Sequence, residues 1–320
     1  MSGLAHPSRV AVTGGTGFIG SHLVDRLLAD GHEVLVIATT PNPVNLALAL
    51  GNPRCSVVSA DICGDDATTA IVEFAPQVVF HLAASASVPA SIADPVHDAQ
   101  VGVVGSVRIF EAARLSGASR IVATASGGTL YGNTTSTNLP LKESAPWRPI
   151  SPYGIAKRAM LDYLRFYSET HHLTTVGLAI ANAYGPRQSS RDNAGLVATL
   201  VNKMVNGEPP VIFGDGTATR DYVYVDDVVD ALMLSGFKDL TGHHVMNIGS
   251  GVETSAIDIL VTLSALLGVN VYPKFQGSYS GQVSRIALCV DHAREVLGWT
   301  PRTALLDGLS QTARALHETP

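Results

Sequence analysis

Apolar and polar positions follow two different periods in the first half of the chain. Short apolar runs are separated by stretches in which apolar residues recur on one helical face, as Leu23, Val24, Leu27 and Leu28 do before Gly31. The runs predict buried strands and the stretches predict amphipathic helices. We predict strands at Val10–Thr13, Val34–Ile37, Val57–Ser59, Val78–Leu82, Ile121–Ala125 and Val176–Ile180, and further helices near Asp98–Ser116 and Pro152–His171.

This alternation of strands and helices predicts an α/β fold. Repeated βαβ units form a parallel sheet with helices on both faces, and right-handed crossovers make that sheet doubly wound, as in a Rossmann fold. The second half is less regular, with Gly, Pro and Asn clustered at Asn182–Gly195 and Asn206–Thr217 and helical stripes at Ala256–Leu267 and from Leu306. We therefore expect a Rossmann domain at 1–179 and a smaller C-terminal lobe at 180–320, with an approximate boundary across which segments can interleave.

Composition narrows the class of protein. The 320 residues are 46% hydrophobic and 15% charged, so the chain can bury a sizeable core and is not a disordered protein. The net charge of −6 argues against nucleic-acid binding through a basic face. No apolar run is long enough to span a membrane, and the first residues do not resemble a secretory signal.

Cysteine and histidine positions make a metal site unexpected. The three cysteines form no CxxC pair, which favours reduced thiols and a cytoplasmic location; they are Cys55, Cys63 and Cys289. The adjacent pairs His171–His172 and His243–His244 direct their side chains apart on either a helix or a strand. We therefore expect no metal ion.

A glycine-rich segment lies between the first strand and the first helix. Gly14, Gly17 and Gly20 satisfy GxxGxxG, and Gly15 in place of Gly14 satisfies GxGxxG. Such glycines allow a tight turn and close approach of a pyrophosphate, which the N–H groups at the helix start can bind. The segment predicts dinucleotide binding, with cofactor contacts at Gly14, Gly17, Phe18 and Ile19; an ordinary strand–helix turn is the alternative.

The end of the second strand bears on the choice between NAD and NADP. Ala38 occupies the position where an acidic residue usually binds the ribose hydroxyls, and the first cation after it is Arg54. Thr39 and Thr40 can donate hydrogen bonds but carry no charge. The absence of a cation for a 2′-phosphate favours NAD.

Tyr153 and Lys157 are four residues apart at the start of a predicted helix, so their side chains share one face. A nearby ammonium favours the phenolate and is expected to lower the pKa of the phenol. The pair can therefore act as a general base toward a hydroxyl group that loses a hydride. The alternative is a surface Tyr–Lys pair without a catalytic role.

Five motifs then occur in order along nearly the whole chain: TGGTGFIG at 13–20, HLAA at 81–84, YGIAK at 153–157, NAYGPRQ at 182–188 and GDGTATRDYVYVDDV at 214–228. Together they resemble the extended short-chain dehydrogenase/reductase family and, within it, the NAD-dependent nucleotide-sugar epimerases and dehydratases. The UDP-glucose 4-epimerase group is the nearest in this resemblance.

The resemblance implies that Tyr153 is the catalytic base and that Lys157 assists it and holds the nicotinamide ribose. Family members place a catalytic hydroxyl at the position of Gly127, so Ser126 or Thr129 must supply it here. We favour Ser126 for the sugar and keep Thr129 open; both could instead cap the turn. The related 4,6-dehydratases carry Thr-Asp-Glu in this loop, and the absence of carboxylates here favours an epimerase.

The remaining site residues follow from the same resemblance. Asp61 would receive the adenine amino group, with the cofactor also lined by Thr39, Ile62, Leu82, Ala83 and Ala84. The substrate contacts would come from Ser87, Ser126, Asn182, Arg220 and Arg285. Asn182 and Arg220 match diphosphate-binding positions, although Arg220-Asp221 could be a structural ion pair. Arg285 would replace an arginine that the family has near Tyr279, and Gly102 replaces a family asparagine beside the cofactor.

The implied activity is C4 epimerisation of a UDP-hexose through a transient 4-ketosugar, with hydride passing to and from bound NAD. The alternatives are a 4-ketoreductase or 4,6-dehydratase, and a catalytically silent NAD-binding sensor. The resemblance further implies a homodimer that forms through the helices predicted at Asp98–Ser116 and Pro152–His171. We expect no nucleic-acid or membrane partner.

Overall fold

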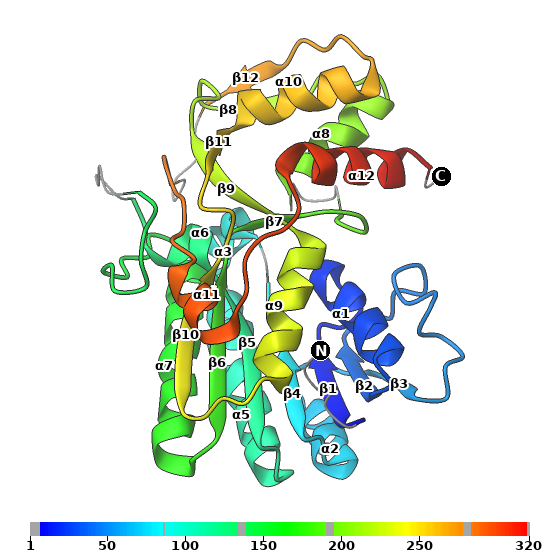
Figure 1. The fold of residues 1–320 in the computed structure, drawn as a ribbon, viewed down its shortest axis with the longest axis vertical. Helices are drawn as coiled ribbons and strands as arrows, with labels where there is room; N and C mark the ends of the chain where they lie inside the picture. Colours follow the sequence, from blue (N-terminus) through cyan, green and yellow to red (C-terminus); the bar gives the residue numbers. More distant parts are fainter. Residues whose placement is uncertain (1–6, 86, 134–138, 190–194, 278–282, 319–320) are drawn as a thin grey trace.

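The computed structural model describes residues 7–85, 87–133, 139–189, 195–277 and 283–318. Its larger part is a sheet covered by helices, and its smaller part lies beyond the carboxyl ends of the strands (Figure 1). Among the described residues, no helix has the length and apolar character required to cross a membrane.

Seven strands form the large sheet in the order β10-β6-β5-β4-β1-β2-β3, and all neighbours are parallel. The strands are β1 (Arg9–Thr13), β2 (Glu33–Ala38), β3 (Cys55–Ser59), β4 (Val78–His81), β5 (Arg120–Ser126), β6 (Thr174–Ile180) and β10 (His243–Ile248). The six predicted strands and the doubly wound parallel sheet are confirmed. The chain order reverses between β1 and β4, and such a switch point opens a crevice at the carboxyl ends of the strands.

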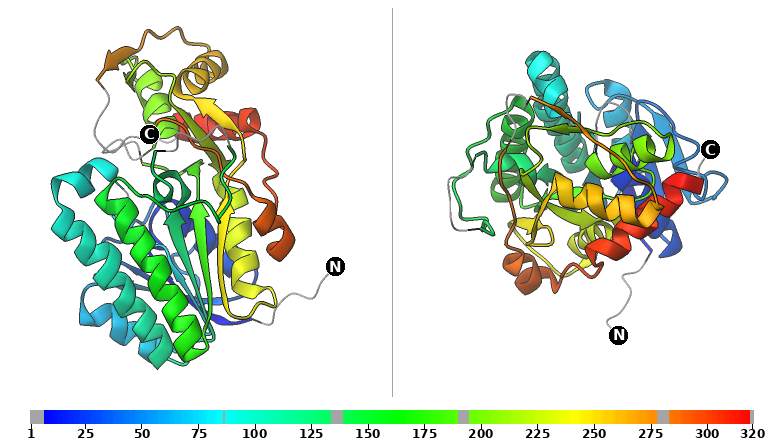
Figure 2. Two further views of the ribbon diagram at one scale, coloured as in Figure 1. Left: turned by 90° about the vertical axis from the view of Figure 1, so that its left-hand side faces the viewer. Right: turned by 90° about the horizontal axis from the view of Figure 1, so that it is seen from above.

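Alternate residues of β1 pack on opposite faces of the sheet. Val10 and Val12 belong to the core under one helical layer, and Ala11 belongs to the core under the other. The first layer contains α1 (Phe18–Ala29), α9 (Val225–Phe237) and α11 (Asp291–Leu297), and the second contains α2 (Asp65–Phe74), α5 (Ser106–Leu115) and α7 (Pro152–His171). Figure 2 shows α5 and α7 on one side of the sheet and α9 on the other. Burial on both faces explains why the strands read as continuous apolar runs.

The helix predicted near Asp98–Ser116 is interrupted. The chain forms α4 (Pro95–Ala99), a π-helical turn η1 (Gln100–Gly105) and then α5. A Cβ atom at Gly102 would lie 2.8 Å from the Ala156 Cβ atom on α7, so the missing side chain permits a close approach of the two segments. The helix at Pro152–His171 is observed with the predicted bounds, capped by Ser151, whose side chain accepts a hydrogen bond from Gly154 N.

The smaller part has its own sheet and core. Its three-stranded sheet contains β7 (Asn182–Tyr184), β9 (Thr219–Tyr224) and β11 (Glu253–Ser255), and its second sheet pairs β8 (Val211–Phe213) with β12 (Lys274–Gln276). Its helices are α8 (Leu196–Val205), α10 (Ala256–Leu267) and α12 (Leu305–Glu318).

The chain after residue 180 contributes to both parts. Strand β10 pairs with β6 in the large sheet, and helices α9 and α11 pack on that sheet, although all three follow residue 180 in sequence. Residue 180 is therefore where the chain first leaves the large sheet, and the segments on either side of it interleave in space.

Candidate active site

A cavity of about 640 Å³ opens at the switch point between β1 and β4. The lining includes these residues predicted to bind the cofactor: Gly14, Gly17, Phe18, Ile19, Thr39, Asp61, Ile62, Leu82, Ala83 and Ala84. They come from the segments that follow β1, β2, β3 and β4, including the first residues of α1. The structure thus gathers them in one cavity, and their contacts with a cofactor stay a prediction.

The glycine-rich loop forms the floor of this cavity. Gly14 has a φ of +71°, donates a hydrogen bond to Ile37 O at 2.7 Å, and approaches Ala83 so closely that a Cβ atom would lie 2.7 Å from the Ala83 nitrogen. At the start of α1 the N-cap residue is Gly17, and no side chain caps the helix. The first amides of α1 are therefore not engaged by a capping side chain, and the loop fits the pyrophosphate of a dinucleotide.

Two polar residues lie farther along the same cavity. Asp61 Oδ1 accepts a hydrogen bond from Cys63 N at 2.8 Å, so this carboxylate shapes its own turn while it also lines the cavity. Ala38 and Thr39 line the cavity at the end of β2 without a charged group. The end of β2, where ribose and a 2′-phosphate are expected to be distinguished, therefore contributes only uncharged residues, Ala38 and Thr39, to the cavity lining.

Lys157 is buried behind the cofactor cavity. Its side chain is 4% exposed, and Nζ donates a hydrogen bond to Thr124 O at 2.7 Å, where Thr124 itself lines the cavity. The nitrogen lies 5.9 Å from the centre of the Tyr153 ring. Burial lowers the pKa of Lys157 to about 8, and the nearby Asp98 carboxylate opposes that shift. The i, i+4 spacing on α7 thus places both side chains together, as predicted.

The pKa of Tyr153 differs from the sequence-based expectation. Burial raises it to about 12; a hydrogen bond with Ser126 acts to lower it, and the Asp98 carboxylate raises it further. The expected lowering of the pKa by Lys157 is not observed, and burial dominates because removal of water from around the phenol penalises the phenolate. Burial of Tyr153 therefore opposes the phenolate form that a proton acceptor requires.

The two candidate hydroxyl groups occupy different environments. Ser126 ends β5 and hydrogen-bonds with Tyr153, whereas Thr129 lies in α6 (Gly127–Leu130) with its buried Oγ1 lacking a hydrogen-bond partner among the described residues. A side chain at Gly127 would collide with Leu288. A Cβ atom at Gly127 would also lie 2.9 Å from Ala179 O, so the structure leaves little room for a side chain at this position. The role of Ser126 or Thr129 as the catalytic hydroxyl group stays a prediction.

A second cavity, of about 240 Å³, lies between the large sheet and the smaller part. Ser126, Thr129, Tyr153, Asn182 and Arg220 all line it, which brings the predicted catalytic groups and two predicted substrate residues together. A third cavity, of about 430 Å³, extends from it, and the two share five lining residues, namely Asn182, Gly195, Leu196, Arg220 and Tyr222. The result is an elongated cleft with Tyr153 near one end.

Arg220 and its neighbour Asp221 have separate surroundings. Arg220 lines the cleft, and its Nη1 donates a hydrogen bond to Thr219 O at 2.7 Å. The buried Asp221 carboxylate accepts hydrogen bonds from the amides of Ser250, Gly251 and Leu288 at 2.6, 3.0 and 3.0 Å. Asp221 therefore joins loops of the chain, while Arg220 faces the cleft.

Two predicted substrate residues have other partners. Ser87 caps α3 (Val88–Ala93) by accepting a hydrogen bond from Ala90 N at 3.2 Å. Arg285 forms a two-point ion pair with Glu253, with N–O distances of 2.9 and 2.6 Å, and its side chain is 56% exposed. Neither is among the lining residues of the cavities described above. Their contact with a substrate stays a prediction that this geometry does not favour.

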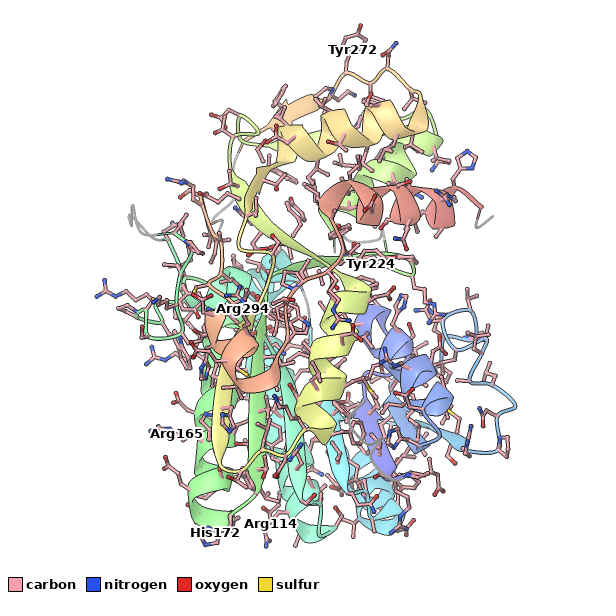
Figure 3. The ribbon with its side chains drawn as sticks, in the orientation of Figure 1. Arg114, Arg165, His172, Tyr224, Tyr272 and Arg294 are labelled. Carbon is pink, nitrogen blue, oxygen red and sulfur yellow. The ribbon has the colours of Figure 1, made fainter. Side chains whose placement is uncertain are left out.

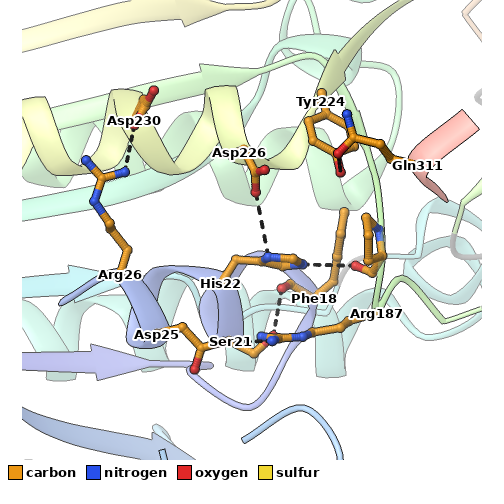
Figure 4. A network of polar contacts seen from close by, with 11 residues as sticks. Phe18, Ser21, His22, Asp25, Arg26, Arg187, Tyr224, Asp226, Asp230 and Gln311 are labelled. Carbon is orange, nitrogen blue, oxygen red and sulfur yellow. Dashed lines mark hydrogen bonds and ion pairs between the residues drawn. The ribbon is translucent and has the colours of Figure 1, made fainter. Parts of the chain in front are cut away.

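A polar network joins the cofactor helix to the loop after β7 (Figure 4). His22 on α1 hydrogen-bonds through Nε2 with Pro186 O at 3.0 Å and lies 3.8 Å from Asp226 on α9. Arg187 pairs with Asp25 on α1 at 2.7 Å. Residues of the same loop, including Gln188, line the substrate cleft. A further contact involves Tyr224, which is labelled in Figure 3 where the two parts meet. Its hydroxyl group donates a hydrogen bond of 3.1 Å to Gln311 of helix α12.

A Tyr–Lys pair beside a dinucleotide-type crevice, on a doubly wound sheet, defines a class of α/β proteins that bind a dinucleotide and place a general base next to it. The chain belongs to the NAD dependent epimerase/dehydratase family, whose model matches residues 10–249. This match and the observed sheet confirm the family and fold class predicted from the sequence.

Similar proteins cover nearly the full chain. The UDP-glucose 4-epimerase of Mycolicibacterium smegmatis is 44% identical, over 95% of this chain and 97% of its own length. The crystal structure of UDP-glucose 4-epimerase with UDP-glucose from Thermotoga maritima has a TM-score of 0.92 at 36% identity, covering 97% of this chain and 99% of that one. The Thermus thermophilus UDP-glucose 4-epimerase in complex with NAD has a TM-score of 0.89 at 33% identity, covering 98% and 100%.

Proposed function

We propose that this chain is an NAD-dependent nucleotide-sugar epimerase that inverts C4 of a UDP-hexose, with UDP-glucose as the first substrate to test. The observation that carries the proposal is the position of the Tyr153–Lys157 pair between two cavities. Tyr153 lines the substrate cleft, while Lys157 binds the backbone of Thr124 in the wall of the cofactor cavity. A proton acceptor thus lies where a sugar and a nicotinamide ring would meet.

The cofactor cavity suits NAD in three respects. Gly14 leaves the space that a side chain would fill, and the N-cap residue of α1 is Gly17, which has no side chain to cap the helix. The first cation after Ala38 in the sequence is Arg54, so none directly follows Ala38 to receive a 2′-phosphate. The residues of this cavity would hold NAD, which would supply a reversible hydride acceptor for the sugar carbon. The chain's own residues bind and orient both partners and move the proton.

Tyr153 takes the proton from the C4 hydroxyl group as the hydride leaves. The Ser126 hydroxyl group, which already hydrogen-bonds with Tyr153, is placed to share that proton with the sugar oxygen. The buried ammonium of Lys157 favours the phenolate electrostatically. The 4-ketosugar then presents its other face, and Tyr153 returns the proton as the hydride returns.

The part of the cleft where its two cavities join is suited to a diphosphate. Arg220 lines both parts of the cleft beside Asn182, and a guanidinium binds phosphate oxygens through paired donors and a permanent charge. We assign Asn182 and Arg220 to diphosphate binding on this basis.

The loop at 127–129 favours epimerisation over elimination. It contains Gly127, Gly128 and Thr129 and has no carboxylic acid to carry the protons that the loss of water requires. A 4-ketoreductase is the remaining enzymatic alternative, and it differs in its use of cofactor. A reductase consumes NAD(P)H in proportion to product, whereas an epimerase turns over with catalytic NAD.

The direct test is incubation with UDP-glucose and a substoichiometric amount of NAD. We expect UDP-galactose to accumulate to equilibrium, followed by the anomeric proton signals in NMR, without net change in NADH absorbance. Turnover that stops at one equivalent of cofactor would support the reductase instead. Tight NAD binding without any turnover of UDP-sugars would support a catalytically silent sensor.

We also propose a homodimer that buries the outer faces of α5 and α7. Large apolar side chains are exposed on these helices, including Leu115, Ile155, Tyr163 and Phe166. Exposed apolar side chains grouped on one face are typical of an interface with another chain. Light scattering should return twice the chain mass.

A cytoplasmic location is consistent with three free cysteines, at Cys55, Cys63 and Cys289.

A further inference from the structure

A buried carboxylate that the mechanism above does not use lies behind the Tyr–Lys pair. Asp98, on α4, is 3% exposed, and its buried Oδ2 atom has no hydrogen-bond partner in the part of the chain that the structure describes. Burial of a carboxylate without such a partner is costly, so it is normally offset by a nearby positive charge. The question is which cation performs this role.

The packing of two helices places Asp98 near Lys157. Helix α4 packs against α7, and Gly102, about one turn beyond Asp98, approaches Ala156 so closely that a Cβ atom would lie 2.8 Å from the Ala156 Cβ atom. Ala156 directly precedes Lys157 in α7. The neighbours of Asp98 on the same segment, His97 and Val101, line the cofactor cavity. The carboxylate is therefore held next to the segment that carries the catalytic pair.

Few charged groups act on this site. Lys157 from α7 and His97 from α4 act electrostatically on Asp98, and Asp98 acts in turn on Lys157 and on Tyr153. His81 from β4 also faces Lys157, but burial lowers the pKa of its imidazole to about 3, so it is neutral at working pH. Asp98 is thus the anionic counterpart of the buried ammonium.

We propose that Asp98 is a positioning residue whose carboxylate acts through space on the buried ammonium of Lys157 and keeps it in the charged form that assists Tyr153. This inference rests on the proposed function for its catalytic meaning, but the electrostatic coupling of Asp98 and Lys157 can be tested without turnover. Asp98 itself touches neither sugar nor nicotinamide in this account.

The sign of the effect follows from the charges. An anion favours a neighbouring ammonium and disfavours a neighbouring phenolate, so Asp98 raises the pKa of both Lys157 and Tyr153. Removal of its charge lowers both values. Catalysis needs a deprotonated Tyr153 phenol, which sets the acid limb of the pH–rate profile, and a protonated Lys157 amine, which sets the alkaline limb. Removal of the Asp98 charge therefore moves both limbs toward lower pH.

The first experiment compares Asp98→Asn with the unaltered enzyme, with NAD and UDP-glucose, from about pH 6 to about pH 10. We expect the whole kcat profile to move to lower pH by about one unit, with about a tenfold loss of kcat on the alkaline side and little change in KM. Asp98→Glu, which keeps the charge, should restore the position of the profile. A uniform loss of kcat with an unmoved profile would show that Asp98 is only structural and would overturn the proposal.

The matched control is Asp94→Asn. Asp94 caps α4 four residues earlier, where its side chain accepts a hydrogen bond from His97 N at 3.0 Å, and asparagine can keep that cap. This variant removes one negative charge from the same helix, and its pH profile should match that of the unaltered enzyme. An equal shift in the control would show a general charge effect and would also overturn the specific role of Asp98.

A second measurement uses the unaltered protein and needs neither folding of a variant nor activity. The ¹³C carboxyl resonance of Asp98 should change position as Lys157 titrates near pH 8, in protein saturated with NAD. A carboxyl resonance that is flat through that range overturns the coupling. If UDP-glucose is not turned over but this resonance titrates as expected, the proposed function fails while the Asp98–Lys157 coupling stands.

Discussion

Arg187 and Asp25 form an ion pair, with 2.7 Å between Nη2 and Oδ2, that joins the loop after β7 to the cofactor helix α1 (Figure 4). Arg187 adopts a φ of +65°, in the left-handed region that side chains other than glycine rarely occupy. Its half-buried side chain and the adjacent His22–Pro186 hydrogen bond hold the loop in this conformation. These two contacts therefore join the loop that lines the substrate cleft to the helix that lines the cofactor cavity.

Replacement of Arg187 by alanine should weaken substrate binding. Loss of the ion pair leaves Asp25 without its cation and loosens the loop that carries Gln188 into the cleft. We expect KM for UDP-glucose to rise about fivefold with a smaller effect on kcat, as for the loss of one charge-assisted hydrogen bond. Steady-state kinetics measure this split. Arg26→Ala is the control, because Arg26 also pairs from α1 but with Asp30 and Asp230, away from the cleft; an equal rise in KM there would contradict the prediction.

Replacement of Tyr153 by phenylalanine should abolish most of the turnover. The change removes the group that exchanges a proton with the sugar and leaves the ring in place, so kcat should fall by about 10²–10⁴-fold. NAD affinity, measured by calorimetry, should change little. Tyr163→Phe, on the same helix but not among the residues that line the cavities, should retain full activity. Near-normal turnover by Tyr153→Phe would refute the assigned base.

The Ser126 and Thr129 hydroxyl groups can be separated by their effects on pH dependence. The Ser126 hydrogen bond lowers the pKa of Tyr153, so Ser126→Ala should raise that pKa and move the acid limb of the kcat profile to higher pH, with about a tenfold loss of kcat at neutral pH. Thr129→Val removes a hydroxyl group that has no partner among the described residues, and it should leave the acid limb in place. The reverse pattern would assign the proton relay to Thr129.

Replacement of Gly14 by alanine should prevent NAD binding. The added Cβ atom would lie 2.7 Å from Ala83 N at a φ of +71°, so the loop must move from the position that receives the pyrophosphate. Gly31→Ala is the matched control, because Gly31 also has a positive φ, of +92°, but among the described residues its added Cβ atom meets nothing closer than 3.8 Å. Both variants should lose about 1–2 kcal/mol of stability from the left-handed conformation. Calorimetry should detect loss of NAD affinity in the Gly14 variant alone.

Several features of this protein follow from local sequence. The apolar runs indicate the inner strands of the large sheet, because a strand buried on both faces is continuously apolar. The edge strand β3 is only partly buried and is marked by Val57 and Val58 alone. The bounds of α7 and α10 match their predicted ranges, since Ser151 with Pro152 starts one helix and Gly268 ends the other in a left-handed conformation. The turn of the glycine-rich segment and the shared helical face of Tyr153 and Lys157 also depend only on residues close together in the chain.

Other features depend on contacts between distant parts of the chain. The return of β10 to the edge of the large sheet needs pairing with β6, which no local pattern in its own segment indicates. The π-helical turn that interrupts the predicted helix lies where Gly102 packs against Ala156. The pairing of Arg285 with Glu253 and the position of Asp98 behind Lys157 likewise depend on how separate elements pack.

The sequence by itself therefore determined the class of fold and the family, and it placed Tyr153 and Lys157, the proposed catalytic pair, on one helical face. Hydrophobic period, glycine spacing and i, i+4 spacing are all local properties of the chain. The tertiary structure decided which hydroxyl group reaches Tyr153 and which carboxylate faces Lys157. It also decided the pKa of the phenol, since the cost of removing water from a group depends on everything packed around it and not on its neighbours in the chain.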